Sequence, residues 1–133
     1  MIFVNLPVRD LETSKAFYEQ LGYTINPQFT DETAACVVIS DTIYVMLLTH
    51  KKFSEFTDKE IADAHNTAQI LTALSAESKD SVNELVDKAL KNGGTAARDP
   101  QDYGFMYSRS FSDPDGHIWE ILWMNMEAVN TEQ

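Results

Sequence analysis

The sequence predicts an α+β protein built from two tandem βαβββ modules, and three observations support this prediction. The apolar residues show the same order twice: one strand, one amphipathic helix and then three strands. Each predicted helix ends in glycine, at Gly22 in the first half and at Gly93 in the second. A shift of 68 residues lays Phe3 on Leu71 and Leu21 on Ala89, so the order of elements recurs as it would after an internal duplication.

The first module contains five predicted segments, in the order strand, helix, strand, strand, strand: residues 3–8, 9–23, 23–29, 33–40 and 42–49. Leu11, Phe17, Tyr18 and Leu21 recur at helical spacing in the second segment, and Asp10 is suited to cap its start. Asn-Pro and Ser-Asp-Thr turn signals separate the three β-rich runs that follow. The module therefore has one helix to cover one face of its sheet.

The second module repeats this order at residues 68–76, 78–94, 95–100, 103–111 and 117–124. In the segment between the modules, Thr57 and Glu60 precede Ile61 in the pattern of a capping box, which predicts a short helix there. We expect one domain over residues 1–133, divided into module one (1–49), a linker (50–67), module two (68–126) and a tail (127–133).

Composition and charge exclude several classes of function. Ten Lys and Arg against 21 Asp and Glu give a net charge of −11 over 133 residues, which repels nucleic acid and anionic membrane surfaces. The one cysteine, Cys36, lies among apolar residues and has no second cysteine with which to form an internal disulfide. No signal peptide or membrane-spanning run is apparent, so a cytoplasmic location is expected.

Two stretches carry a resemblance to a known family: NLPVRDLETSKAFYEQLG (residues 5–22) and DPDGHIWEI (residues 113–121). With the two modules, they resemble the glyoxalase, bleomycin-resistance and extradiol-dioxygenase group, also called the vicinal oxygen chelate superfamily. Within it, the chain is most similar to proteins labelled predicted lactoylglutathione lyase. The resemblance implies a glyoxalase-like fold, with a cleft between curved mixed sheets. It also implies a metal ion held by His, Glu or Gln from the first and last strands of each module.

The chain departs from the family's metal-binding pattern. The motifs place the four ligand positions at Phe3, Leu47, Leu71 and Glu120, and three of these side chains are hydrocarbon. A register error of one or two residues would bring in Asn5, a poor ligand, or Gln69. The three histidines do not supply the missing ligands, because they lie in or beside the linker (His50, His65) or have strand parity opposite to Glu120 (His117). One carboxylate does not hold a divalent ion against water, so we expect no metal and no cofactor.

The turn SDPDGH fixes the pairing of the last two strands. Pro114 excludes the two-residue mirror-image turns, whereas a type I turn closed by a left-handed Gly116 fits. This register pairs Ser110 with Glu120 and turns Arg109 to the other face. The residues expected to line the cleft are Phe3, Asn5, Leu47, Thr49, Leu71, Ala73, Met106, Ser108, Ser110, Glu120, Leu122 and Met124.

The role of Glu120 stays open at this point. A carboxylate on an apolar wall suits a general acid or base, or a hydrogen-bond donor to a ligand. It is equally compatible with a structural hydrogen bond to Ser108 or Ser110. Glu120 is therefore the one candidate catalytic residue, and whether the protein is an enzyme is undecided.

Four functions fit the sequence. The first is metal-independent binding of a small, partly apolar molecule in the cleft between the modules, like the drug-sequestering members of the family, with a homodimer expected by family analogy. The alternative is a lactoylglutathione-lyase-like or other metal-dependent enzyme, for which Lys51, Lys52 and Arg9 are the basic residues available to an acidic substrate. A metal-free enzyme using Glu120 as base and an interaction module without ligand complete the set.

Overall fold

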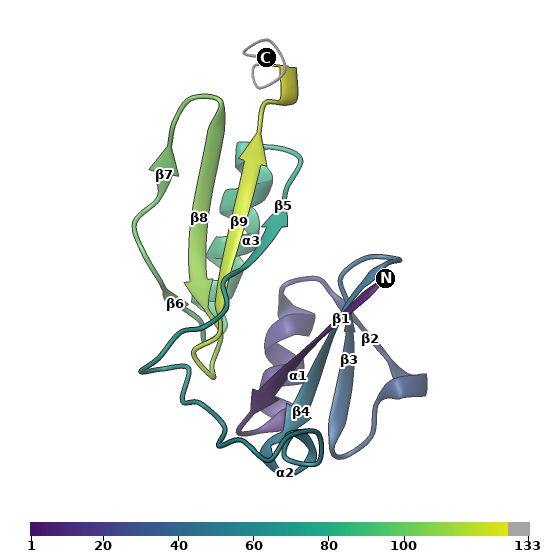
Figure 1. The fold of residues 1–133 in the computed structure, drawn as a ribbon. Coiled ribbons are helices and arrows are strands. Elements are labelled where there is room, and N and C mark those ends of the chain that lie inside the picture. Colours follow the sequence, from purple (N-terminus) through teal and green to yellow (C-terminus); the bar gives the residue numbers. More distant parts are fainter. Residues whose placement is uncertain (128–133) are drawn as a thin grey trace. The chain divides into compact units, whose positions relative to one another are not determined.

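A computed structural model describes residues 1–127 and has the expected α+β class, with two mixed sheets and few helices (Figure 1). The chain divides into two compact units. Unit one consists of residues 1–67 and 114–116, and unit two, within the described residues, of residues 68–113 and 117–127. None of the helices within residues 1–127 has the length and apolar character needed to cross a membrane.

Unit one contains four strands and three short helices. In chain order they are β1 (Ile2–Val8), α1 (Leu11–Gln20), β2 (Thr24–Asn26), the 3-10 helix η1 (Pro27–Phe29), β3 (Ala34–Val38), β4 (Ile43–Thr49) and α2 (His50–Phe53). The strand order is β1-β4-β3-β2. β1 and β4 run parallel, whereas the pairs β4–β3 and β3–β2 are antiparallel.

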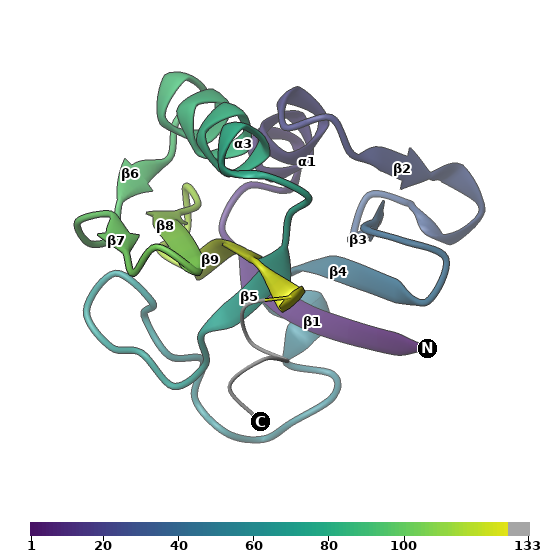
Figure 2. The ribbon, with the colours of Figure 1, turned by 90° about the horizontal axis from the view of Figure 1, so that it is seen from above.

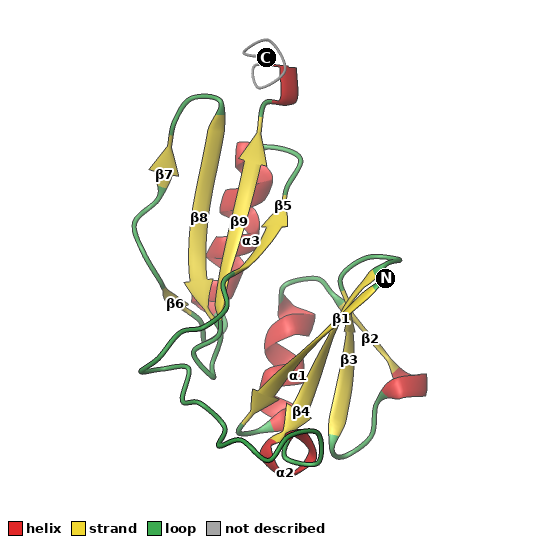
Figure 3. Ribbon diagram, viewed as in Figure 1, coloured by secondary structure: helices red, strands yellow, loops and turns green. Residues whose placement is uncertain are grey.

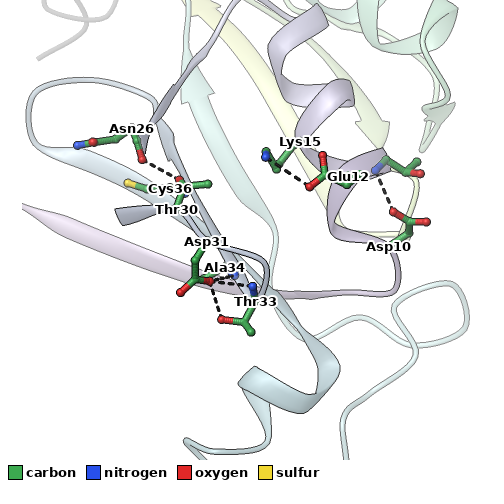
Figure 4. Close-up of polar contacts among 10 residues, drawn as sticks. Asp10, Glu12, Lys15, Asn26, Thr30, Asp31, Thr33, Ala34 and Cys36 are labelled. Carbon is green, nitrogen blue, oxygen red and sulfur yellow. Dashed lines mark hydrogen bonds and ion pairs between the residues drawn. The ribbon is translucent and has the colours of Figure 1, made fainter. Parts of the chain in front are cut away.

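The predicted caps of α1 are confirmed. The Asp10 carboxylate accepts a hydrogen bond from the backbone N–H of Thr13 at 3.1 Å (Figure 4). Gly22 follows the helix with φ of 105°. The same helix buries Phe17 and Tyr18, whose rings meet edge to face at 5.1 Å. Local capping and an apolar stripe therefore fix this helix, as the sequence predicts.

Side-chain hydrogen bonds organise the loop that leads into β3 (Figure 4). The Thr30 hydroxyl donates to the Asn26 carbonyl at 2.7 Å and accepts from the Cys36 N–H at 3.0 Å. The Asp31 carboxylate accepts from the hydroxyl and the backbone N–H of Thr33, each at 2.7 Å, and from the N–H of Ala34 at 3.1 Å. These hydrogen bonds hold the pKa of Asp31 below its ordinary value.

Unit two repeats the topology of unit one (Figure 3). Its elements are β5 (Thr72–Ser75), α3 (Lys79–Lys91), β6 (Thr95–Ala96), β7 (Gln101–Asp102), β8 (Met106–Ser112) and β9 (Ile118–Met124). The strand order β5-β9-β8-β6 matches β1-β4-β3-β2, and β5 and β9 are parallel as β1 and β4 are. Helix α3 packs on β8 and β9 and covers one face of this sheet (Figure 2).

Two predicted elements differ from the structure. The expected strand at residues 95–100 has only two strand residues, because Pro100 has no N–H for a ladder hydrogen bond and the chain bulges outward before β7. The helix predicted from Thr57 and Glu60 is wrong, since residues 57–61 are not helical and the linker helix is instead α2. The Thr57 hydroxyl accepts from the N–H of Lys59 at 3.1 Å, so it closes a turn instead of capping a helix.

The turn between β8 and β9 has the predicted form. Gly116 has φ of 89°, and the backbone N–H of Asp113 donates to the His117 carbonyl at 2.9 Å. The tip, residues 114–116, belongs to unit one, where the backbone N–H of Arg9 donates to an Asp115 carboxylate oxygen at 2.8 Å. A Cβ on Gly116 would lie 2.7 Å from backbone atoms of Ala64 and His65, so this position also requires glycine for space.

Candidate functional site

Contacts with α3 identify the two faces of the second sheet. The hydroxyl of Tyr107 donates to Asn83 at 2.7 Å, and the guanidinium of Arg109 donates to Asn83 at 3.0 Å and to Asp87 at 2.9 Å. Both acceptors lie on α3, so the odd-numbered residues of β8 point toward the helix. Alternation along the strand then turns Ser108 and the other even-numbered residues to the opposite side, which we call the open face because it points away from α3.

The register confirms the predicted pairing around Glu120. Ser110 pairs with Glu120 across the β8–β9 hairpin, and Ala73 of β5 pairs with Glu120 on its other side. Ser108 pairs with Leu122 on the same face. The structure therefore brings these five predicted residues together on the open face of unit two.

Three further predicted residues belong to unit two. Met106 pairs with Met124 at the end of the same hairpin, and by strand parity both lie on the open face. Leu71 comes directly before β5 and is exposed. Arg109, by contrast, is on the helix face as predicted, paired with Ile121 and bonded to α3.

A cation that the sequence analysis overlooked contacts Glu120. The guanidinium of Arg98 lies 3.4 Å from the Glu120 carboxylate, and 23% of the Glu120 side chain is exposed against 52% for Arg98. No pattern in the sequence joins these two residues. The available signal is that Arg98 precedes Asp99-Pro100, which ends the strand and places Arg98 in a loop.

The path of the chain shows how Arg98 reaches Glu120. Ala96 pairs with Phe111 and Gln101 pairs with Ser108, so residues 97–100 form a four-residue bulge beside the two residues 109 and 110 of β8. In the sheet, β8 lies between β9 on one side and β6 and β7, which flank this bulge, on the other. The Arg98 side chain must therefore pass over β8 to meet Glu120.

Small residues lie on the part of β8 over which this ion pair passes. Ser108 is 5% exposed and Ser110 3% exposed. Within residues 1–127, the Ser110 hydroxyl has no hydrogen-bond partner. A buried hydroxyl without a partner costs about 1–3 kcal/mol, so this group is costly for the folded protein unless something else bonds to it.

In unit one, part of the predicted cleft face is wrong. Phe3 pairs with Tyr44, and their rings stack at 5.0 Å, whereas Leu47 pairs with Leu6. Because paired residues share a face and neighbours along a strand alternate, Leu47 lies on the face opposite Phe3 and Asn5, where it is fully buried.

Thr49 is the second correction in this unit. It lies two residues after Leu47 and pairs with Val8, so it shares the face of Leu47 and not that of Phe3. Its hydroxyl accepts from the N–H of Lys52 at 3.2 Å and caps α2. Thr49 thus has a structural role at the end of β4.

The register identifies Met46 as the residue of unit one that corresponds to Glu120. Asn5 lies 68 residues before Ala73; Asn5 pairs with Met46, and Ala73 pairs with Glu120. The sequence analysis placed this position one residue away, at Leu47. In a strand, an error of one residue moves the side chain to the other face.

The residues at these strand positions do not fit a divalent metal ion. Phe3 and Leu71 have no donor atom, and Met46 offers only a thioether, a soft ligand. Glu120 is paired with Arg98. In the part of the chain that the structure describes, no group of three or more His, Cys, Asp or Glu side chains is arranged to hold a metal ion.

Unit one also has a hollow of about 160 Å³ at the start of α1. It is lined by Arg9, Asp10, Thr13, His65, Pro114 and Asp115. None of the residues predicted to bind a substrate lines it. The hollow contains two carboxylates, and one of them, Asp10, already caps the helix.

Comparison with known proteins agrees with this geometry. A family model described as Bleomycin resistance protein-like N-terminal matches residues 1–40. No curated protein matches the chain. Among solved structures, the hypothetical protein SA1046 from S. aureus is similar at 29% identity and a TM-score of 0.79, with 92% of each chain covered.

Two other solved structures carry descriptive names. A glyoxalase/bleomycin resistance protein/dioxygenase family enzyme from Burkholderia phytofirmans PsJN is 20% identical, with a TM-score of 0.78 over 92% of this chain and 96% of that one. A bleomycin resistance determinant encoded on the transposon Tn5 is 19% identical, with a TM-score of 0.64 over 93% of this chain and 97% of that one. With its repeated topology, the chain has the fold of solved structures named for the glyoxalase, bleomycin-resistance and dioxygenase group, and its residues 1–40 match the bleomycin resistance protein-like N-terminal model.

Proposed function

We propose that the protein binds a small, partly apolar molecule on the open face around Glu120 and does so without a divalent metal ion. The observation that carries this proposal is the ion pair between Arg98 and Glu120 at 3.4 Å. A metal ion would have to displace this internal cation. It would then find only one hard ligand at the four family positions.

The surroundings of Glu120 support binding of a partly apolar molecule. Leu122, Ala73 and Met106 supply apolar surface, and the serines of β8 supply hydroxyls, a mixture typical of small-molecule sites. On the first sheet, taken by itself, we propose a ligand-contacting face made of Phe3, Asn5 and Met46, the last in place of Leu47 and Thr49.

The setting of this function is also proposed. The one cysteine and the net charge of −11 fit a cytoplasmic protein, and we propose that it forms a homodimer. Two of the similar solved structures are named as resistance proteins, for bleomycin and for fosfomycin. Sequestering a small molecule is therefore the activity we favour.

Metal titration provides the primary test. We expect the purified protein, after chelator treatment and dialysis, to bind Zn²⁺ and Ni²⁺ at well below one equivalent in calorimetry. Glu120→Gln should leave this weak binding unchanged, because within residues 1–127 Glu120 belongs to no group of three or more His, Cys, Asp or Glu side chains that could hold a metal ion. Stoichiometric binding that disappears in Glu120→Gln would refute metal independence.

A metal-dependent lyase remains the second candidate, because Glu120 is a carboxylate at a family ligand position and similar structures are named as enzymes. In such an enzyme, the ion polarises vicinal oxygens while a carboxylate moves a proton. We expect no turnover of the methylglyoxal–glutathione adduct with added Ni²⁺ or Zn²⁺. Turnover that depends on Glu120 would replace the binding proposal with this one.

A further inference from the structure

We infer that Arg98, Glu120 and Ser110 form a polar subsite that selects a neutral group containing both a hydrogen-bond donor and an acceptor, such as a primary carboxamide. The inference rests on the proposed function, since it specifies the chemistry of the ligand on the same open face. It is carried by the ion pair, by its path over β8 and by the unpartnered hydroxyl.

The ion pair presents opposite hydrogen-bonding character side by side. Arg98 is half exposed and has five N–H donors, of which one carboxylate uses at most two. Glu120 keeps acceptor sites on its two oxygens. A carboxamide matches both, because its carbonyl accepts from the guanidinium while its N–H donates to the carboxylate.

Charged groups match this subsite less well. A ligand carboxylate would pair with Arg98 but would be repelled by Glu120. An ammonium group would pair with Glu120 but would be repelled by Arg98. The net charge of −11 further disfavours anions over the whole molecule. A neutral group avoids both repulsions and keeps the ion pair intact.

Ser110 adds a third polar group, and its pairing with Glu120 locates the subsite on the open face. It pairs directly with Glu120 on the open face, and in the described chain its buried hydroxyl lacks a partner. A ligand amide that enters beside Glu120 can supply the missing hydrogen bond. Buried polar groups are rarely left unpaired in folded proteins, so this hydroxyl calls for a partner, and we assign that role to the ligand.

Three probes of one shape test this selectivity: benzamide, benzoate and benzylammonium, each titrated into ¹⁵N-labelled protein. We expect benzamide to bind about tenfold more tightly than either ion, the effect of one good hydrogen bond to a charged group. The shifted backbone amides should include those of Ser110 and Glu120.

Two variants should change the order of the probes in opposite directions. Glu120→Gln leaves Arg98 without its carboxylate partner, so benzoate should become the tightest of the three. Arg98→Met leaves Glu120 without its cation, so benzylammonium should become the tightest. Asp87→Asn is the matched control, because it removes the carboxylate partner of Arg109 on the helix face and should leave the order unchanged.

The outcomes separate this inference from the proposed function. Binding of benzoate or benzylammonium ahead of benzamide to the unmodified protein would overturn the inference and leave small-molecule binding standing. The inference would also be overturned if neither variant changed the order of the three probe affinities while the spectra showed both variants to be folded. If no probe at millimolar concentration shifts the open-face amides, the proposed function fails together with the inference.

Discussion

Replacing Ser110 by alanine should stabilise the protein, an unusual result for a change at a buried strand position. The side chain is 3% exposed, and its hydroxyl has no partner within residues 1–127. Removing an unpartnered buried hydroxyl recovers a desolvation cost of about 1–3 kcal/mol, from which alanine's weaker strand preference subtracts a few tenths. We expect a net gain of about 1 kcal/mol, or an increase of about 3–5 °C in the melting temperature for a chain of this length.

Urea denaturation followed by tryptophan fluorescence measures this gain, with Ser14→Ala as a matched control. Ser14 is fully buried in α1, and its hydroxyl is likewise without a partner in the described chain. Both variants should therefore gain stability, but only Ser110→Ala should weaken benzamide binding. A loss of 1 kcal/mol or more in Ser110→Ala would mean that the hydroxyl makes a stabilising bond in the free protein, and the reasoning would fail.

Three other measurements test separate parts of the structure. Leu47→Ala should cost about 2–5 kcal/mol of unfolding free energy, because Leu47 is fully buried. Met46→Ala, on the half-buried opposite face, should cost roughly half as much, and equal losses for the two variants would contradict the register. Burial raises the pKa of the Cys36 thiol, so the folded protein should react with a thiol reagent only as fast as it unfolds, and rapid reaction of one equivalent would contradict this burial. Hydrogen bonds hold the pKa of Asp31 below its ordinary value of 3.8. The ionised carboxylate therefore stabilises the folded protein above pH 3.8, and this stabilisation is lost as the pH falls below that value. Urea midpoints measured between about pH 2 and 6 should depend less on pH in Asp31→Asn than in the unmodified protein.

Most of the fold could be predicted because local chemistry determines it. Asp10 and Gly22 mark the ends of α1 through capping and a left-handed backbone. Pro114 and Gly116 allow one form of hairpin turn, and that turn sets every pair from Ser112–Ile118 onward. These features can be recognised from a few neighbouring residues, so the sequence alone is sufficient to identify them.

The errors arise where distant parts of the chain decide the outcome. Leu47 was placed on the wrong face because the register of a parallel pair depends on a strand some 40 residues away, and no turn connects β1 directly to β4. The Thr57 capping pattern is present, but the hydroxyl bonds to Lys59 and closes a turn. Arg98 was overlooked because only the bulge beside β8 brings it to Glu120.

The two units have chemically different residues at the same position of their sheets. Met46 occupies it in unit one with an apolar side chain that needs no counter-charge, whereas unit two has Glu120 there and must neutralise it. The four-residue bulge after β6 supplies Arg98 for this purpose, and serines at 108 and 110 leave room for its side chain over β8. The acid, the bulge and the small residues therefore form one arrangement. If Glu120 had no function, leucine or methionine in its place would make the bulge, Arg98 and the small residues unnecessary. This is why we regard Glu120 as part of a binding site.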